Sequence, residues 1–370
     1  MKCKVCREHA IVDIRRHNAG FCQEHFVEHV TNQVARTIKE FKMFRPDNRL
    51  LLAVSGGKDS LALWDILVGL GYDVTGFYLD LGIGGYSTRS KDASVVFAEE
   101  HGLKLIVRSL NEEHGFTVPE LSTLTGRVPC SGCGLNKRYE FNRAALEEGF
   151  EVLVTGHNLD DEVATLFGNV LHWNTDMLGR QMPVLEERIL GEGGSSRVAL
   201  VRKVKPLVKL AERETAAYAL LKGIDYVVEE CPMVEGNTQH RYKEAITMLE
   251  ETSPGTKSQF YSGFLKKAAD RFRSADGADL DGGEIVACSS CGAPTVTWEP
   301  TRGGLGQTAE QTRGGLGQTA EQTRGGLGQT AEQNAAAKAR CAFCKTKALA
   351  LERKQDPESA RPRRRRRARS

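Results

Sequence analysis

The sequence predicts an α/β protein with an open, mostly parallel sheet and a small zinc finger near each end of the chain. Three observations lead to this fold class. Apolar runs of strand length alternate with helical patterns between residues 50 and 156. A glycine-rich turn over Ser55–Ser60 joins the first of these strands to a helix. Closely spaced cysteine pairs lie near both ends of the chain.

The expected elements follow one another in a strand-helix order. They are a strand over Leu50–Val54, a helix over Leu61–Val68, a strand over Asp73–Asp80, a helix over Ser87–His101, a strand over Lys104–Leu110, a helix over Leu135–Glu148 and a strand over Glu151–Gly156. Ligands bind beyond the carboxyl ends of the strands in such sheets. We therefore expect Ala53–Ser60, Leu79–Gly85 and Gly156–Glu162 to meet in one crevice.

Length and charge limit the class of protein. The chain has 370 residues, 40% of them hydrophobic, which suits two or three globular domains. The net charge of +3 conceals seven arginines in Arg361–Ser370; without them, 44 basic residues face 48 acidic ones. No apolar run reaches the length of a membrane span, about 18 residues, and the first residues lack a secretory signal. A cytosolic protein without a membrane partner is expected.

The amino-terminal cysteines have the spacing of a zinc site. Cys3 and Cys6 form one close pair, and Cys22 and His25 form a second. Two such pairs match the tetrahedral ligand set of structural zinc. His9 is a rival for the fourth position, and scattered reduced thiols are the alternative to a metal site.

A second zinc site is expected near the carboxyl end. Cys288 and Cys291 are separated from Cys341 and Cys344 by 49 residues, longer than the usual ribbon. Residues 301–333 are three copies of TRGGLGQTAEQ, and removing these 33 leaves 16. We interpret the repeat as an insertion in the tip of a zinc ribbon and expect a loop. A stacked solenoid is the rival interpretation, which the low apolar content disfavours.

Three central cysteines remain, namely Cys130, Cys133 and Cys231. Three thiolates without an obvious fourth ligand suit a [4Fe-4S] cluster with one open iron, or a redox pair with a sulfur-carrying thiol. A structural zinc is the alternative. Lys137 follows the first pair on a predicted helix, so it either faces the same site or lies on a solvated helix face.

The turn Ser55-Gly56-Gly57-Lys58-Asp59-Ser60 predicts a phosphate site. Backbone amides at the start of a helix bind anions, and glycines allow close approach. The spacing differs from GxxxxGK[ST] and matches the PP-loop of enzymes that split ATP between its α and β phosphates. An incidental glycine-rich turn is the alternative. We expect Lys58 and Ser60 to hold phosphate, and Asp59 and Asp161 to bind Mg²⁺. Backbone groups at Ala53, Leu79 and Gly156 are expected to contact adenine and ribose.

Taken together, these motifs resemble the TtuA and cytosolic thiouridylase family of tRNA 2-thiouridine synthetases. The resemblance rests on SGGKDS, the paired amino-terminal CxxC and CxxH, PCSGCG, GHNLDDE, Cys231 and the carboxyl-terminal double CxxC, and it runs from Met1 to about Leu351. It implies a PP-loop ATPase core, two zinc ions, and a [4Fe-4S] cluster on Cys130, Cys133 and Cys231. It also implies that Lys137 and Asp161 are catalytic. The repeat and the arginine tail depart from the family pattern.

The resemblance further implies an activity and partners. The C2 oxygen of a tRNA uridine would attack the α phosphate of ATP, and a sulfur nucleophile would then displace AMP. A ubiquitin-like carrier protein would supply the sulfur, and a homodimer is expected. Two basic groups are candidates for tRNA phosphates, although charge runs are usually solvated faces. They are Arg202, Lys203 and Lys205, and Lys266, Lys267 and Arg271.

The expected domains follow from these features. They are an amino-terminal zinc finger over 1–26, a PP-loop domain with the cluster site over 27–235, a helical segment over 236–282, a zinc ribbon over 283–352 and a disordered basic tail over 353–370. The tail either adds salt-sensitive RNA affinity or is dispensable. Rival functions are a tRNA 2-thiocytidine synthetase, another AMP-forming tRNA-modification enzyme such as a lysidine synthetase, and a non-catalytic zinc-finger RNA-binding protein.

Overall fold

The computed structural model describes residues 1–190, 197–234, 237–272, 285–296 and 339–356. The repeat over 301–333 and most of the arginine-rich tail lie outside the described residues, so the predictions for both stay predictions. In the described part of the chain, no helix is long and apolar enough to cross a bilayer.

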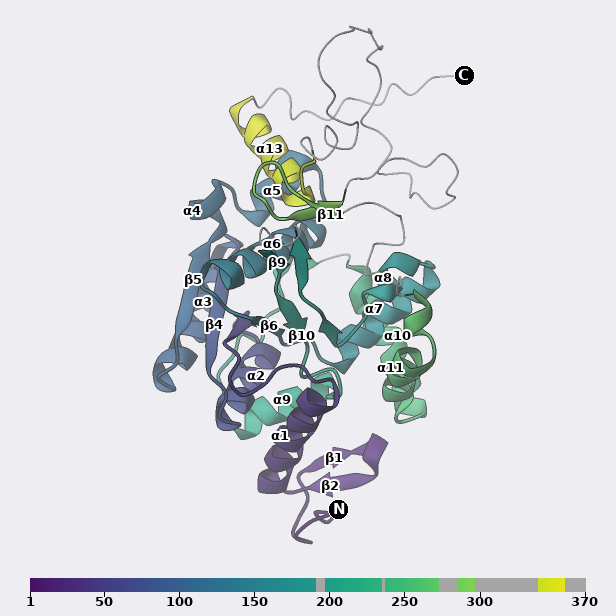
Figure 1. The fold of residues 1–370 in the computed structure, drawn as a ribbon. Helices are drawn as coiled ribbons and strands as arrows, with labels where there is room; N and C mark the ends of the chain where they lie inside the picture. The colour runs from purple at the N-terminus through teal and green to yellow at the C-terminus, as the bar shows by residue number, and fades with distance from the viewer. Residues whose placement is uncertain (191–196, 235–236, 273–284, 297–338, 357–370) are drawn as a thin grey trace, which may run out of the picture.

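The core is a six-stranded sheet with the order β5, β4, β3, β6, β10, β7 (Figure 1). Its strands are β3 (Leu50–Val54), β4 (Val74–Asp80), β5 (Leu105–Ser109), β6 (Val152–Thr155), β7 (Val184–Leu185) and β10 (Arg202–Val204). All neighbouring pairs are parallel except β10 with the edge strand β7. The predicted open, mostly parallel sheet is therefore confirmed.

Helices cover both faces of the sheet, because side chains on a strand alternate between its faces. Leu50, Leu52 and Val54 pack with α1 (Gln23–Glu40), α2 (Lys58–Gly69) and α9 (Glu212–Leu221). Leu51 and Leu153 pack on the other face with α5 (Val118–Thr125) and α6 (Pro129–Glu147). A strand buried on both faces needs a continuous apolar run, as in LLLAV.

A third apolar core lies where a group of helices packs beside the sheet (Figure 1), and Val208 from a turn contributes to it. It joins α7 (Leu159–Leu171), α8 (Thr175–Gly179), α10 (Thr238–Thr252) and α11 (Thr256–Lys267). Gly168 on α7 lets α10 come close, because a Cβ there would lie 2.7 Å from the Tyr242 ring. The carboxyl half of the chain is thereby held against α7, which begins at the crevice.

Each end of the described chain carries a small module, and the two lie at opposite ends of the molecule (Figure 1). The amino-terminal module pairs β1 (Val12–Ile14) with β2 (Ala19–Phe21). The carboxyl-terminal one pairs β11 (Ile285–Ala287) with β12 (Pro294–Val296) and adds α13 (Ala342–Gln355). Elements between them include α3 (Gly84–Glu100), α4 (Leu110–His114), β8 (Arg188–Leu190) and β9 (Arg197–Leu200).

The predicted elements all form; the strand over Leu50–Val54 has its predicted bounds, and the ends of the others are shifted. The largest shift is in α6, which begins at Pro129 rather than Leu135. Proline is favoured in the first turn of a helix, so α6 begins at Pro129 although glycines follow it. Cys130 and Cys133 consequently lie on the helix instead of on a loop before it.

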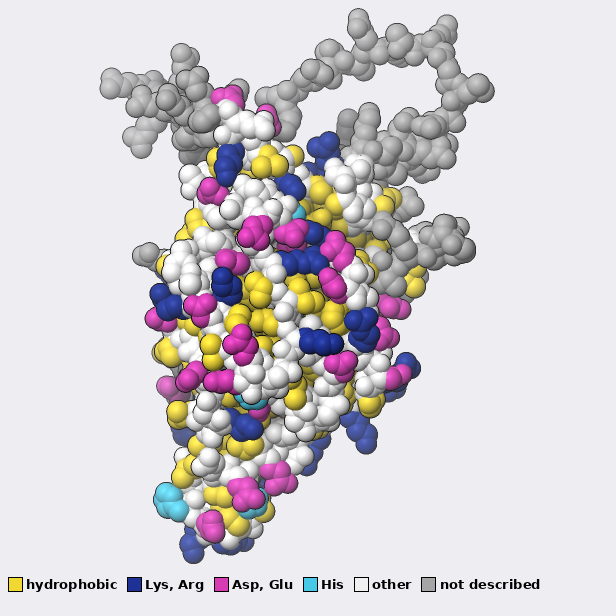
Figure 2. Space-filling view, turned by 90° about the vertical axis from the view of Figure 1, so that its left-hand side faces the viewer, with side chains coloured by type: hydrophobic (Ala, Val, Ile, Leu, Met, Phe, Trp, Pro, Cys, Tyr) yellow, Lys and Arg dark blue, Asp and Glu magenta, His cyan; other side chains and the backbone are white. Residues whose placement is uncertain are grey.

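The side of the molecule that carries α3 and α4 is mixed in charge (Figure 2). Lysines and arginines there are interspersed with acids, and several are paired, as Arg108 is with Glu147 at 2.7 Å and Arg143 with Glu113 at 2.6 Å. Paired charges of both signs attract a polyanion weakly. This face is not where we expect nucleic acid to bind.

We predict that Gly76→Ala lowers the free energy of unfolding by about 1–3 kcal/mol, as overpacking of a core does. A Cβ at residue 76 on β4 would lie 2.3 Å from Cη2 of Trp64, whose side chain is fully buried and has no room to move. Urea unfolding measures the change. Gly69→Ala is the matched control, because no atom lies within 4 Å of its added Cβ. Equal stability of G76A and the parent would contradict the packing described.

Candidate active site

The PP-loop connects β3 to α2 and is closed by Ser60. Its hydroxyl accepts a hydrogen bond from the Ser55 amide at 3.1 Å and donates one to the Gly57 carbonyl at 3.0 Å. Gly57 stands at the amino-terminal cap of α2, and no side chain caps the helix there. Uncapped amides at a helix start carry partial positive charge and bind anions. The loop therefore fits a phosphate group.

Two glycines of this region are required by close packing of the protein on itself. Gly56 has φ +71°, and a Cβ there would lie 2.3 Å from the Ser90 carbonyl oxygen on α3. Gly156, just after β6, would place a Cβ 3.1 Å from the Ser60 amide nitrogen. Gly156, Ala53 and Leu79 lie at the carboxyl ends of three adjacent strands, as expected. Their contacts with adenine and ribose remain a prediction.

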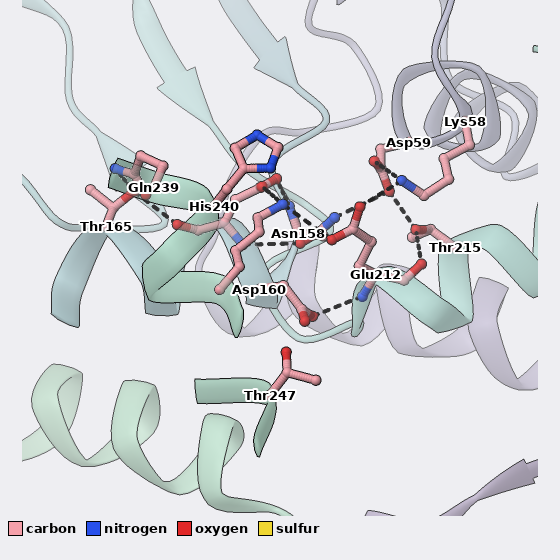
Figure 3. A network of polar contacts seen from close by, with 12 residues as sticks. Lys58, Asp59, Asn158, Asp160, Thr165, Glu212, Thr215, Gln239, His240 and Thr247 are labelled. Carbon is pink, nitrogen blue, oxygen red and sulfur yellow. Dashed lines mark hydrogen bonds and ion pairs between the residues drawn. The ribbon is translucent and has the colours of Figure 1, made fainter. Parts of the chain in front are cut away.

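Lysines and carboxylates from four helices meet beside the loop (Figure 3). Lys58 Nζ lies 2.8 Å from Glu212 and 3.1 Å from Asp59. Lys243 Nζ on α10 lies 2.6 Å from Asp161 and 3.1 Å from Glu212. Glu212 thus joins the two lysines.

Asn158 connects the two acids that were expected to bind magnesium. Its side-chain amide donates to Asp59 at 3.2 Å, and its side-chain oxygen accepts from the Asp161 amide at 3.1 Å, capping α7. The Thr215 hydroxyl also donates to Asp59. The structure therefore brings Asp59 and Asp161 to one place, from the ends of β3 and β6.

The carboxyl groups of this network differ in pKa. Burial opposes ionisation of Glu212, but hydrogen bonds and charge from Lys58 and Lys243 outweigh it and lower its pKa to about 2. Burial raises the pKa of Asp59, and the charge of Asp161 adds to this effect. Three carboxylates face two lysines here, an excess of negative charge that fits a divalent cation with oxygen ligands.

Sequence reasoning missed Glu212, Thr215 and Lys243. Glu212 lies 154 residues after Lys58, and Lys243 lies 31 residues after Glu212. Neither stands in a motif, and the local signal for the start of α9 is the pair of acids, Glu212 and Glu214, in its first turn. Their role became visible only when α9 and α10 were placed beside the loop.

The three central cysteines and Lys137 are neighbours. Burial raises the pKa of Cys130, the charges of Cys133 and Cys231 raise it further, and Lys137 lowers it. Cys130 Sγ lies 3.6 Å from the Met233 carbonyl oxygen, two residues beyond Cys231. Cys133 and Cys231 pack against the same apolar core.

The central thiols are not drawn together as tightly as the terminal ones. Within the described residues, only the two terminal sets bring three or more potential ligand atoms within 4.8 Å of one another. Ligands of a cubane cluster bind different irons and stand farther apart than ligands of one ion. The sulfurs of Cys130, Cys133 and Cys231 do not all lie within 4.8 Å of one another. The choice between a [4Fe-4S] cluster and zinc stays a prediction.

One segment joins these cysteines to the PP-loop. The Val227 amide donates to the Gly56 carbonyl at 2.9 Å, four residues before Cys231. Asn237 then lies 3.8 Å from Cys130 Sγ and caps α10, the helix that carries Lys243. The segment that carries Cys231 thus contacts the PP-loop, and Asn237 contacts Cys130. That the cysteines and the loop share one crevice stays a prediction.

The two terminal ligand sets have tetrahedral dimensions. They are Cys3, Cys6, Cys22 and His25, and Cys288, Cys291, Cys341 and Cys344. The sulfurs of Cys6 and Cys22, and those of Cys291 and Cys341, lie 3.7 Å apart. A tetrahedral ion with metal–sulfur bonds of about 2.3 Å requires about 3.8 Å between sulfurs. The structure places His25, and not His9, in the first set.

The structure corrects the interpretation of Lys205 as a phosphate ligand. Lys205 is 8% exposed and forms an ion pair with the buried Glu162 at 2.7 Å. Arg202 pairs with Glu186 at 2.6 Å and donates to the Lys42 carbonyl. Lys205 directly follows β10, which lies between β6 and β7, whereas Arg202 and Lys203 on β10 are only half-buried. Lys266 and Lys267 are exposed in the last turn of α11.

Comparisons with known proteins identify the family of this chain. Residues 28–246 match the PP-loop domain family, and residues 2–27 match the amino-terminal LIM domain of the 2-thiouridine synthetase TtuA. The tRNA-5-methyluridine(54) 2-sulfurtransferase of Thermus thermophilus is 47% identical over 80% of this chain and 88% of the relative. The chain belongs to this family. A Pyrococcus horikoshii relative of the same name is 40% identical over 80% of this chain and 90% of its own.

A solved structure extends the family likeness to the fold. The U34-tRNA thiolase NcsA of Methanococcus maripaludis, with its [4Fe-4S] cluster, superposes with a TM-score of 0.63 at 26% identity. The match covers 72% of this chain and 87% of that one. Family membership confirms the resemblance seen in the motifs. The chain is therefore an enzyme of the tRNA 2-sulfurtransferase family with an ATP-binding PP-loop domain.

We predict that Lys205→Met lowers the free energy of unfolding by about 3–5 kcal/mol, because it leaves the Glu162 carboxylate buried and unpaired. Among the described residues, Glu162 would keep hydrogen bonds from Gln181 at 3.1 Å and from Tyr261 at 3.3 Å, neither of which is charged. Urea unfolding tests this, and K205M/E162Q should recover part of the loss. An unaltered unfolding midpoint of K205M together with weaker RNA binding would favour the original phosphate interpretation.

Proposed function

We propose that this protein is a tRNA 2-sulfurtransferase that replaces the C2 oxygen of 5-methyluridine 54 by sulfur at the expense of ATP. The observation that carries the proposal is the segment from Val227 to Lys243, which contacts both the PP-loop and Cys130. Position 54 is preferred over position 34 because three relatives named for it are 38–47% identical, whereas the U34 thiolase is 26% identical.

In the first step of the proposed reaction, the uridine O2 attacks the α phosphorus of ATP and pyrophosphate leaves, while N3 loses its proton. Lys58 and Lys243 are the ammonium groups next to the loop and would stabilise charge on the phosphates. Glu212 holds both of them now, so ATP must displace it or share them. Asp161 orients Lys243, and with Asp59 it would hold Mg²⁺ beside the triphosphate.

In the second step, a sulfur nucleophile adds to C2 and AMP departs with the former O2, while the S–H proton passes to N3. Cys130, Cys133 and Cys231 would hold a [4Fe-4S] cluster. Such a cluster, bound by three cysteines, offers one iron without a protein ligand that can carry the sulfur. Lys137 lies where its charge acts on Cys130, so it would stabilise negative charge in this step.

The remaining assignments are proposals that rest on the resemblance and on ligand chemistry. Both terminal sets would hold Zn²⁺, since closed sets of sulfur and imidazole ligands leave no open position for catalysis. A ubiquitin-like carrier would deliver sulfur, and the chain would act as a homodimer in the cytoplasm. The proposed domains end at residues 26, 235, 282 and 352, as the sequence predicts.

We predict that Cys231→Ala abolishes 2-thiolation and leaves ATP affinity unchanged, because Cys231 is a cluster ligand in this proposal and is not one of the lysines and carboxylates beside the PP-loop. Mass spectrometry of tRNA nucleosides and nucleotide binding under anaerobic conditions measure the two effects. Val228→Ala is the control, as its side chain is 78% exposed in the same segment. Thiolation by C231A at the parent rate would refute the assignment.

We predict two zinc ions per chain by elemental analysis. His25→Ala should retain one, because it removes a ligand from the amino-terminal set, while His9→Ala should retain both. A single zinc in H9A and two in H25A would show that His9 is the fourth ligand after all.

A further inference from the structure

Three basic side chains of the site are not used by the proposed reaction, and they converge on the face of the sheet that α6 covers. Lys203 on β10 lies in register with Leu153 on β6, so both side chains point to the same face. Leu153 packs against α6. His157 follows two residues after Thr155 and bonds to its hydroxyl oxygen at 2.9 Å.

Arg138 reaches this group from α6. Its guanidinium folds back over Gly134, where a Cβ would lie only 3.1 Å from Nη1. Gly134 directly follows Cys133, and the charge of Cys133 acts on Arg138. The glycine after the second cysteine therefore leaves room for the arginine beside the cluster ligands.

The positive charges of Lys203 and Arg138 are not balanced by acids of their own. Burial lowers the pKa of Lys203 to about 8, Lys205 and Arg138 lower it as well, and only Glu162 opposes them. Glu162 is already bonded to Lys205. Neither the Lys203 ammonium nor the Arg138 guanidinium has a hydrogen bond or an ion pair with any residue in the described ranges.

His157 adds a neutral group to this pair. Burial, Lys203 and Lys205 lower its pKa to about 4, so it carries no charge near pH 7. The Thr155 hydroxyl donates to the Val204 carbonyl, which makes it an acceptor for Nδ1–H of His157. Although these groups are partly desolvated, solvent reaches them, since His157 and Arg138 are exposed and Lys203 is half-buried.

We propose that Arg138 and Lys203, with the neutral His157 beside them, form a binding site for one backbone phosphate of the substrate tRNA, beside the nucleotide that is modified; the guanidinium and the ammonium are its hydrogen-bond donors. A guanidinium and an ammonium without acidic partners are suited to a phosphodiester. His157 adjoins Gly156 at the nucleotide-binding strand end, and Arg138 adjoins Cys133. In the proposed reaction the uridine lies between ATP and the cysteines, and its own phosphates would then lie on the side of Arg138 and Lys203. The inference rests on the proposed function, because it takes the substrate from it.

The test compares Lys203→Gln with Lys104→Gln in tRNA binding across a salt series. Lys104 is exposed just before β5, at the opposite end of the strands, and its loss controls for net charge. Losing one phosphate contact should weaken binding and reduce the slope of log affinity against log salt by about 0.7–0.9. K104Q should keep the parent slope. Lys203→Arg should keep the parent slope as well, because it keeps the positive charge. Arg138→Gln should reduce the slope by the same amount as K203Q.

Affinity for ATP and inhibition by pyrophosphate should be the same in K203Q as in the parent. Parent-like tRNA affinity and slope in K203Q would overturn the inference. If pyrophosphate inhibits thiolation by K203Q less than it inhibits the parent, while tRNA binding is unchanged, the inference is also overturned. The site would then bind the released pyrophosphate and not a tRNA phosphate. Failure of the parent enzyme to thiolate tRNA would refute the proposed function separately, because tRNA binding is measured without turnover.

Discussion

The shared ion pair of Glu212 with Lys58 and Lys243 is the interaction on which the site depends. It fastens the PP-loop to α9 and α10, and through Lys243 it reaches Asp161 at the start of α7. Two lysines held by one carboxylate keep their ammonium groups in place for an anion with more charge than Glu212 carries. A triphosphate with its metal ion is such an anion, so these contacts would hold the two lysines in position for ATP.

The carboxyl-terminal module has a similar structural role toward the cysteines. Phe343 on α13 stacks on Tyr139 of α6 with ring centroids 3.7 Å apart. Nearby, Lys347 contacts His114 at 2.9 Å, and His114 contacts the fully buried Glu140 of α6 at 2.6 Å. A buried chain of polar groups with every member satisfied fixes one arrangement of its helices. The module thus holds α6, the helix that presents Cys130, Cys133, Lys137 and Arg138.

The parts that could be predicted from the sequence have local signatures. LLLAV, the PP-loop and the cysteine pairs each lie within a few residues, so spacing alone identifies them. Contacts between distant segments have no such signature, which is why Glu212 and Lys243 were missed. Lys205 looked like a surface base, yet three-residue β10 is inserted between β6 and β7 and buries it. Strand insertion is a property of the whole sheet, not of the pattern Arg-Lys-Val-Lys.

The central claim is that the three cysteines and the opened ATP share one crevice. Electron paramagnetic resonance of anaerobically prepared protein tests it most directly, with Mn²⁺ in place of Mg²⁺ beside a non-hydrolysable ATP analogue. The account predicts that reducing the iron–sulfur cluster broadens the Mn²⁺ signal through magnetic coupling, and that this effect disappears in the absence of the nucleotide analogue. A Mn²⁺ signal that is indifferent to the redox state of a fully loaded cluster would contradict it.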